Sequence, residues 1–261
     1  MGGHAEGFET ASRGKWSHAE GMNSIAWAES SHVEGNRTEA SNVAAHAEGA
    51  DTLAKGEASH AEGKSTEASG QYAHVEGAGA ISSGSASHAE GSGNASGSNA
   101  HAEGYKTVAS GGYGAHAEGN TTQATGIAAH SEGRETVASA QGAHVEGYQT
   151  VASDAYAHAG GSYSKAQKHS SFAHGYVAIA SAQDQAVVGR LNKTNDNALF
   201  IVGNGNRSNW AKSTAFEVLA DGSAYLQTQG TSDNSVMINA TFNKYQAKDE
   251  NGNPVHGLAS S

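Results

Sequence analysis

The chain has 261 residues, a net charge of −11, 35 glycines, one proline and no cysteine. The lack of cysteine excludes disulfides and thiolate metal sites. The 15 lysines and arginines form no basic stripe, so a nucleic-acid partner is not expected. No apolar run approaches the roughly 20 residues that a membrane-spanning helix needs, and we therefore expect no membrane insertion.

The most regular feature is the tetrapeptide His-Ala-Glu-Gly, which begins at His4 and occurs twelve times with small variations. Its histidines stand at positions 4, 18, 32, 46, 60, 74, 88, 101, 116, 130, 144 and 158. Every spacing is 14 residues except for one of 13 followed by one of 15, and these two cancel. A fixed period of this kind predicts a solenoid, in which each repeat forms one coil of a rod.

The second half of each period is centred on Thr-x-Ala, as at Thr38 and Ala40, and glycine often ends both halves. Two short segments that each end in glycine predict two strands and two tight turns per coil. Successive coils would stack as parallel strands about 4.8 Å apart, giving an all-β rod roughly 60 Å long over residues 1–189. Coils rich in Ala, Ser and Gly bury little apolar area, so we expect several chains to cover one another.

The 14-residue pattern is lost after the repeat, and we expect residues 190–261 to form a small C-terminal cap or tip rich in β-hairpins. Residues 198–202 alternate as an apolar strand should, and residues 214–226 contain an Ala-Asp-Gly-Ser turn between two strand-like segments. Residues 235–240 predict one more strand, and the polar end of the chain is predicted to be frayed. Because the chain starts directly with the repeat, we also expect it to be a piece of a longer protein.

The period, the glycine positions and the alanine placement resemble the YadA-like head domains of trimeric autotransporter adhesins. That family alternates a Ser-Val-Ala-Ile-Gly segment with an Ala-Ser-Gly segment, and residues 129–133 (Ala-His-Ser-Glu-Gly) and 137–139 (Val-Ala-Ser) fit these two slots. His and Glu occupy slots where the family has Val and Ile. The resemblance covers about residues 4–189 and implies a left-handed parallel β-roll that assembles as a homotrimer.

The His-Ala-Glu-Gly version of the repeat resembles repeats in tail-fibre and tail-appendage proteins of bacteriophages and prophages. Residues 197–205 and 215–218, with Asp221 and Gly222, are similar to the segment that follows such repeats. In some relatives this segment leads into a self-cleaving chaperone domain, which is not recognisable in this chain. The resemblance implies a tail protein that contacts a host cell, or one that is matured by such a domain.

Residues two apart in a strand point to one face, so the His and Glu of each repeat should stack into two ladders. Three interpretations are open: His–Glu pairing that supports the fold inside the roll or at a trimer interface, a surface that binds a ligand, and metal coordination. The first is favoured because the slots become apolar where the motif decays, at Phe172, Ala186 and Val188. A dozen metal sites in a row would be unusual, so no metal and no cofactor are expected. The ladder residues are His18, Glu20, His32, Glu34, His46, Glu48, His60, Glu62, His74, Glu76, His88, Glu90, His101, Glu103, His116, Glu118, His130, Glu132, His144 and Glu146.

Twelvefold repetition indicates a scaffold rather than an enzyme, and no nucleophile motif or paired-carboxylate cleft is present. We expect a rigid trimeric rod of a phage tail fibre, located in the virion tail, that presents a binding region to a glycan or protein of a bacterial surface. The alternative is the head of a trimeric adhesin on a bacterial cell surface. Trp210, Tyr225 and Tyr245 are weak candidates for ligand binding, because aromatic rings form stacking platforms. Packing of the terminal cap is the other interpretation of these three rings.

Overall fold

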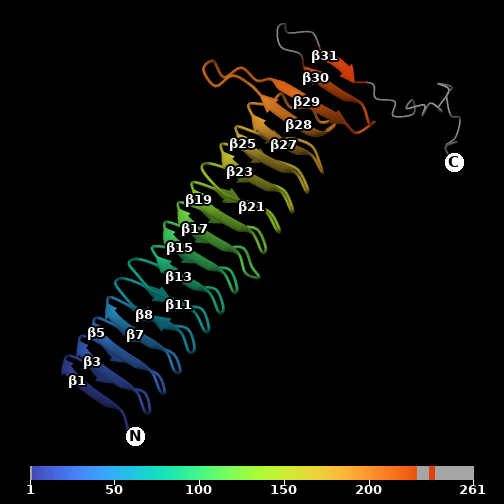
Figure 1. The fold of residues 1–261 in the computed structure, drawn as a ribbon. Helices are drawn as coiled ribbons and strands as arrows, with labels where there is room; N and C mark the ends of the chain where they lie inside the picture. The colour runs from blue at the N-terminus through green and yellow to red at the C-terminus, as the bar shows by residue number, and fades with distance from the viewer. Residues whose placement is uncertain (1, 228–234, 239–261) are drawn as a thin grey trace, which may run out of the picture.

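The computed structural model describes residues 2–227 and 235–238 and shows a long rod of stacked coils (Figure 1). Two parallel sheets run along the rod, and each strand pairs with its equivalent in the next coil, 13 to 15 residues away, as His4 does with His18. The predicted all-β parallel solenoid and its coil length are therefore confirmed, as is a short antiparallel segment at the C-terminal end. Among the described residues, no helix has the length and apolarity that a membrane span requires.

Each coil contributes one strand to each sheet. The first sheet, which we call the histidine sheet, consists of β1 (His4–Phe8), β3 (His18–Met22), β5 (His32–Asn36), β7 (His46–Ala50), β9 (His60–Ala61), β11 (His74–Val75), β13 (His88–Gly91), β15 (His101–Tyr105), β17 (His116–Asn120), β19 (His130–Arg134), β21 (His144–Val145), β23 (His158–Ser162), β25 (Phe172–Tyr176) and β27 (Ala186–Arg190), followed by the C-terminal strands described below. The second, which we call the short-strand sheet, consists of β2 (Ala11–Ser12), β4 (Ile25–Ala26), β6 (Glu39–Ala40), β8 (Leu53–Ala54), β10 (Glu67–Ala68), β12 (Ile81–Ser82), β14 (Asn94–Ala95), β16 (Val108–Ala109), β18 (Gln123–Ala124), β20 (Val137–Ala138), β22 (Val151–Ala152), β24 (Lys165–Ala166) and β26 (Ile179–Ala180).

The register of the stack survives the two irregular spacings of the repeat. The missing residue lies in the turn at residues 92–93, before Asn94 takes its place between its neighbours in the short-strand sheet. The extra residue lies in the opposite turn, at residues 110–115, before His116 pairs with His101. Both changes are confined to turns, so every strand keeps its pairing partners.

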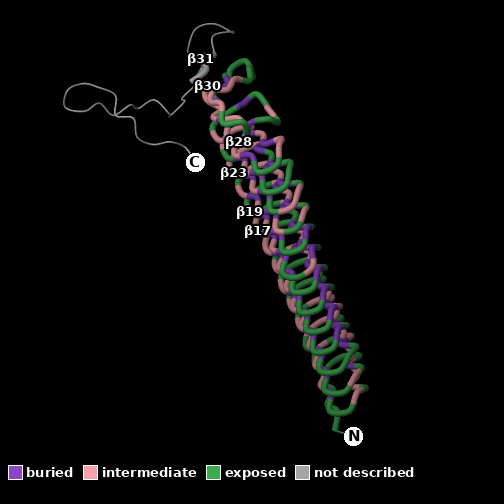
Figure 2. The backbone as a smooth tube through the Cα atoms, turned by 90° about the vertical axis from the view of Figure 1, so that its right-hand side faces the viewer, coloured by how far each residue is buried: buried purple, intermediate pink, exposed green. Residues whose placement is uncertain are grey.

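The interior of the rod is filled mainly by alanine, and it appears as a buried strip along the tube in Figure 2. The residue after each histidine points inward, and Ala19 and Val33 have 0% exposure. In the short-strand sheet, the alanine that ends most strands, such as Ala40, also points into this interior. The buried Thr or Ser two residues before it, such as Thr38, does the same. Small side chains on both inner faces allow the two sheets to approach closely.

The glycine after each glutamate allows close stacking of the coils. Gly63 has a φ of 102°, and a Cβ at this position would collide with the carbonyl oxygen of Gly77 in the next coil. Other corners reach the left-handed region without glycine, as Ala58 does with a φ of 50°. The repeat therefore requires glycine where backbones touch and tolerates strain where they do not.

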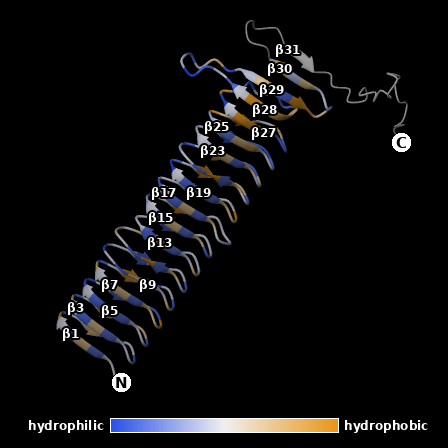
Figure 3. Ribbon diagram, in the orientation of Figure 1, coloured by the Kyte–Doolittle hydropathy of each residue, from blue (hydrophilic) through white to orange (hydrophobic). Residues whose placement is uncertain are grey.

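The parallel stack ends with β28 (Ala198–Asn204), which lies in register on β27. The chain then turns back, and β29 (Thr214–Leu219), β30 (Ala224–Gln227) and β31 (Ser235–Ile238) add antiparallel strands to the same sheet. Figure 3 shows stronger hydrophobic colour at β28 and β29 than along most of the rod. This end therefore has larger apolar side chains than the coils that precede it.

Two buried amide side chains close the end of the short-strand sheet. Asn192 accepts a hydrogen bond from the backbone N–H of Ile179 at 2.8 Å and donates one to its carbonyl oxygen at 3.0 Å. Gln185 donates to the carbonyl oxygen of Ala198 at 2.6 Å and accepts from the N–H of Ser181 at 2.9 Å. Because β26 is the last strand of its sheet, the Asn192 amide takes the place that a following strand would fill.

Candidate functional site

The histidines and glutamates of the repeat form two adjacent columns on the outer face of the histidine sheet. Their side chains are half-exposed, with 34% for His46 and 40% for Glu48, whereas the residue between them is fully buried. A location inside the roll is therefore excluded. The apolar replacements continue the same outer columns, because Phe172 stacks on His158 and Val188 on the His174 position.

The histidine column is a continuous stack of imidazole rings. Ring centroids of successive histidines lie 4.5 to 5.1 Å apart from His4 to His158. From His46 to His116 the rings are within 10° of parallel, whereas from His116 onward they tilt by 37° to 39°. The middle of the column is therefore the most regular part of this surface.

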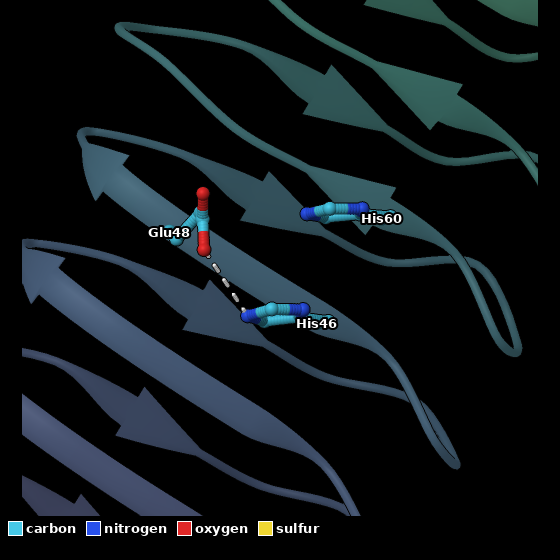
Figure 4. A group of neighbouring side chains, drawn as sticks. All are labelled: His46, Glu48 and His60. Carbon is cyan, nitrogen blue, oxygen red and sulfur yellow. Dashed lines mark ion pairs between the residues drawn. The ribbon is translucent and has the colours of Figure 1, made fainter.

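Six histidines of the repeat have a nitrogen within 4 Å of a glutamate oxygen, at a separation longer than a hydrogen bond. The Nε2 of His46 is 3.6 Å from a carboxylate oxygen of Glu48 in the same coil (Figure 4). His74 instead approaches Glu62 of the preceding coil, with Nε2 3.7 Å from the carboxylate oxygen. Hydrogen bonds of this type have donor–acceptor distances of about 2.7–3.2 Å, so the two columns are neighbours rather than a chain of short ion pairs.

Burial and crowding shift the pKa values of five histidines and two glutamates in these columns toward the neutral forms. Burial, followed by the charges of neighbouring imidazoles, lowers the pKa of His46, His60, His88, His116 and His158, and nearby carboxylates oppose this only in part. The pKa of Glu62 is raised first by its hydrogen bond to the Glu76 carboxyl and then by burial. Burial, then the charge of Glu103, raises the pKa of Glu90.

The histidine column carries a row of nitrogen atoms without hydrogen bonds. The Nε2 atom is buried and has no hydrogen-bond partner among the described residues at His158 and in seven successive coils, at His46, His60, His74, His88, His101, His116 and His130. A buried polar atom that lacks a partner costs free energy of about 1–3 kcal/mol. With the carboxylates beside it, this surface is a repeated array of nitrogen and oxygen donors.

The three aromatic candidates of the C-terminal region are placed differently. Trp210 is 59% exposed, and its ring centroid lies 5.9 Å from that of Tyr176. Tyr225 is half-buried within β30, where it pairs with Glu217 of β29. Tyr245 lies outside the described residues. The structure therefore gives Trp210 an exposed position and Tyr225 a position within the sheet.

Trp210 lies at the end of a short row of tyrosine rings that the sequence pattern does not predict. Tyr148, Tyr163 and Tyr176 lie on successive coils, with ring centroids 5.2 Å and 5.9 Å apart, and Arg207 stacks over Tyr176 at 3.7 Å. The sequence indicates this row only weakly, because the tyrosines fall four or five residues after the histidine slot instead of at one fixed position of the repeat. The buried amides Gln185 and Asn192 gave a clearer signal, since each replaces a small residue at a core position of the repeat.

Comparison with known proteins does not assign this chain to a group. No model of a known protein family matches it, and no curated protein matches its sequence. The structure shows a parallel β-solenoid with histidine-rich repeats.

Proposed function

We propose that the chain is a structural and host-recognition part of a phage tail fibre, in which a rigid rod presents its C-terminal end to a bacterial surface. The observation that carries this proposal is the uninterrupted stack from β1 to β28. Fourteen steps of about 4.8 Å give a rod roughly 65 Å long. Residues of chemical interest are repeated along it, as expected for a scaffold, and the non-repeated surface is gathered at one end.

The outer face of the short-strand sheet supports assembly into a homotrimer. The first residue of each short strand points outward, and in seven coils it is apolar: Ile25, Leu53, Ile81, Val108, Val137, Val151 and Ile179. These residues share one column with polar residues such as Glu67 and Asn94, and only Val137 and Val151 are direct neighbours in it. Ile81 is 40% exposed. Other copies of this chain are the occupant that fits, because they have the same length and coil spacing. Packing of these copies on the short-strand sheet would bury more apolar surface than the alanine core of one chain does.

The end of the rod supports recognition. Trp210 is exposed there beside Tyr176, and Arg207 stacks on the same tyrosine. Exposed aromatic rings next to an arginine provide stacking surfaces and hydrogen-bond donors of the kind that bind glycans and protein surfaces. We propose that this cluster contacts the host, with no enzymatic step involved.

The assembly is tested by light scattering of the full chain in solution. We expect three times the mass of one chain, and a monomer would contradict the trimer. Replacing Ile81 and Val108 by aspartate should lower the mass, because the charges would lie in the interface. Replacing Ala78, in a turn between the sheets, by aspartate is the matched control and should leave the mass unchanged.

Recognition is tested by binding of the labelled protein to bacterial cells and to glycan arrays. Trp210→Ala should weaken binding, whereas Trp16→Ala, an equally exposed tryptophan near the other end with 57% exposure, should not. Equal binding by both variants and the unchanged protein would remove Trp210 from the site. Binding to extracellular matrix instead of bacteria would favour the adhesin alternative.

A further inference from the structure

The middle of the histidine and glutamate columns contains repeated groups of three donor side chains. In each group, one nitrogen or oxygen atom from each residue lies within 4.8 Å of the other two. Every group combines residues of two neighbouring coils, so the stacking of the coils creates it. Five of the six such groups among the described residues are considered further: His46, Glu48 and His60; Glu62, His74 and Glu76; Glu76, His88 and Glu90; Glu90, His101 and Glu103; and Glu103, His116 and Glu118.

The separations within these groups suit ligands of one ion better than partners of one hydrogen bond. In Figure 4, Glu48 lies beside both imidazoles of its group, and its carboxylate oxygen is 3.6 Å from the Nε2 of His46. Zinc binds nitrogen and oxygen at about 2.0–2.2 Å, which places two ligands of a tetrahedral or trigonal site roughly 3.3–3.7 Å apart. The observed gap is therefore close to the gap that an ion would bridge.

Two further observations coincide with the groups. Every histidine in the five groups has a buried Nε2 without a hydrogen-bond partner in the described structure. The same stretch, from His46 to His116, is the part of the column in which the rings lie within 10° of parallel. The imidazole nitrogens of these groups are thus held in place and lack a hydrogen-bond partner among the described residues.

From this geometry we infer that the His46–Glu118 part of the ladder binds divalent transition-metal ions of the zinc class, at sites shared between neighbouring coils. Imidazole nitrogen combined with carboxylate oxygen favours zinc over magnesium or calcium, which prefer oxygen alone. A dozen equivalent sites would be unusual, and these groups occupy only part of the ladder. Adjacent groups share Glu76, Glu90 and Glu103, so ions should fill alternate positions and number fewer than the groups.

The test uses the full chain after treatment with EDTA and dialysis. Titration calorimetry with zinc chloride, together with metal analysis of the dialysed complex, should show more than one zinc ion per chain, and magnesium chloride should show no binding. The variant with His74→Gln, His88→Gln and His101→Gln should bind fewer zinc ions per chain, because three of the five groups lose a ligand while the other two keep theirs. Its matched control carries His4→Gln, His18→Gln and His32→Gln, at the same repeat position outside the five groups, and should bind zinc as the unchanged protein does.

Circular dichroism checks that each variant keeps its strands. Should the glutamine substitutions at histidine disturb the coils, the variant with Glu76→Gln, Glu90→Gln and Glu103→Gln tests the same sites from the carboxylate column. It should also bind fewer zinc ions per chain, because four of the five groups lose a ligand. The inference is overturned if the unchanged protein takes up no zinc, or if the variants with altered groups bind it as well as the control does.

Discussion

The repeated coils and the closing coil of this rod solve the same packing problem with different residues. In the repeated coils, the interior consists of small side chains such as Ala47 and Ala61, and neighbouring coils satisfy each other's backbone groups. In the closing coil no further strand of the described residues follows in the short-strand sheet, and the buried side chains of Gln185 and Asn192 bond to the backbone instead. Propagation therefore needs only small residues and glycine, whereas termination needs particular polar side chains.

The outer faces show the same contrast. The repeated coils expose identical columns of His and Glu, while the last coils replace them with Phe172, Ala186 and Val188 in the same register. Beyond them β29 pairs with β28 in the antiparallel direction and covers its edge. An exposed edge of a parallel stack would invite further pairing, so the reversal of direction and the larger apolar residues end the rod.

Breaking the stack between two repeated coils should have the largest effect. In Gly63→Ala, the new Cβ would collide with the backbone of Gly77, and alanine would be forced into a φ of 102°. We expect the free energy of unfolding to fall by about 3 kcal/mol or more, measured by denaturant unfolding. Gly112→Ala is the control, since nothing lies within 4 Å of its Cβ position. Equal stability of the two variants would contradict the role of close coil contact.

Removing the cap should have the next largest effect and should act at the end of the rod. Asn192→Ala would leave the backbone N–H and carbonyl of Ile179 without their bonds at a buried position, and we expect a loss of about 2 kcal/mol. Hydrogen exchange should increase first at β26. Asn42→Ala, which removes an exposed amide that also bonds to backbone, is the control and should change stability by less than about 1 kcal/mol. Unchanged exchange at β26 in Asn192→Ala would show that the amide does not cap the sheet.

The sequence alone predicts the repeated coils well and the closing coil poorly, for a physical reason. The period fixes which residues stack, and alternation within His-Ala-Glu-Gly places alanine inside and the two polar residues outside. It does not predict that His and Glu stay 3.6 Å or more apart, because that depends on side-chain rotation within the columns. Nor does it predict that Gln185 and Asn192 close the stack, since their bonds join residues 10 and 13 positions away along an irregular path.

Acid should weaken the repeated coils through the imidazole column. The pKa of His46, His60, His88, His116 and His158 is lowered in the folded chain, so the unfolded chain takes up protons first as the pH falls. Stability from these groups is complete above the unfolded value of about 6.5 and declines below it toward the folded values. The melting temperature should therefore be constant from pH 8 to 7 and should fall between pH 6.5 and 5.

The carboxyl groups with raised pKa act in the opposite direction. Glu62 and Glu90 favour the folded chain most below the unfolded value of about 4.5, and this contribution is lost as the pH rises through their folded values. Five shifted imidazoles outnumber these two groups, so a net decline with acid is expected. A variant with His46→Gln, His60→Gln and His88→Gln should show a flatter profile. If the melting temperature of this variant falls with acid as steeply as that of the unchanged protein, groups outside the histidine column cause the loss of stability.

The smallest expected effect is a gain in stability from relieving backbone strain at a corner of a repeated coil. Ala58 occupies a left-handed corner with a φ of 50°, which strains any residue with a Cβ by about 1–2 kcal/mol. Glycine removes this strain but adds entropy to the unfolded chain, so Ala58→Gly should stabilise the rod by about 0.5–1 kcal/mol. Ala68→Gly, at a fully buried strand position ten residues away, is the control and should destabilise it by about 1 kcal/mol. Opposite signs for one substitution within neighbouring coils would show that backbone geometry, rather than composition, decides what each repeat position accepts; a loss of stability in both would mean that the corner strain is relieved elsewhere in the coil.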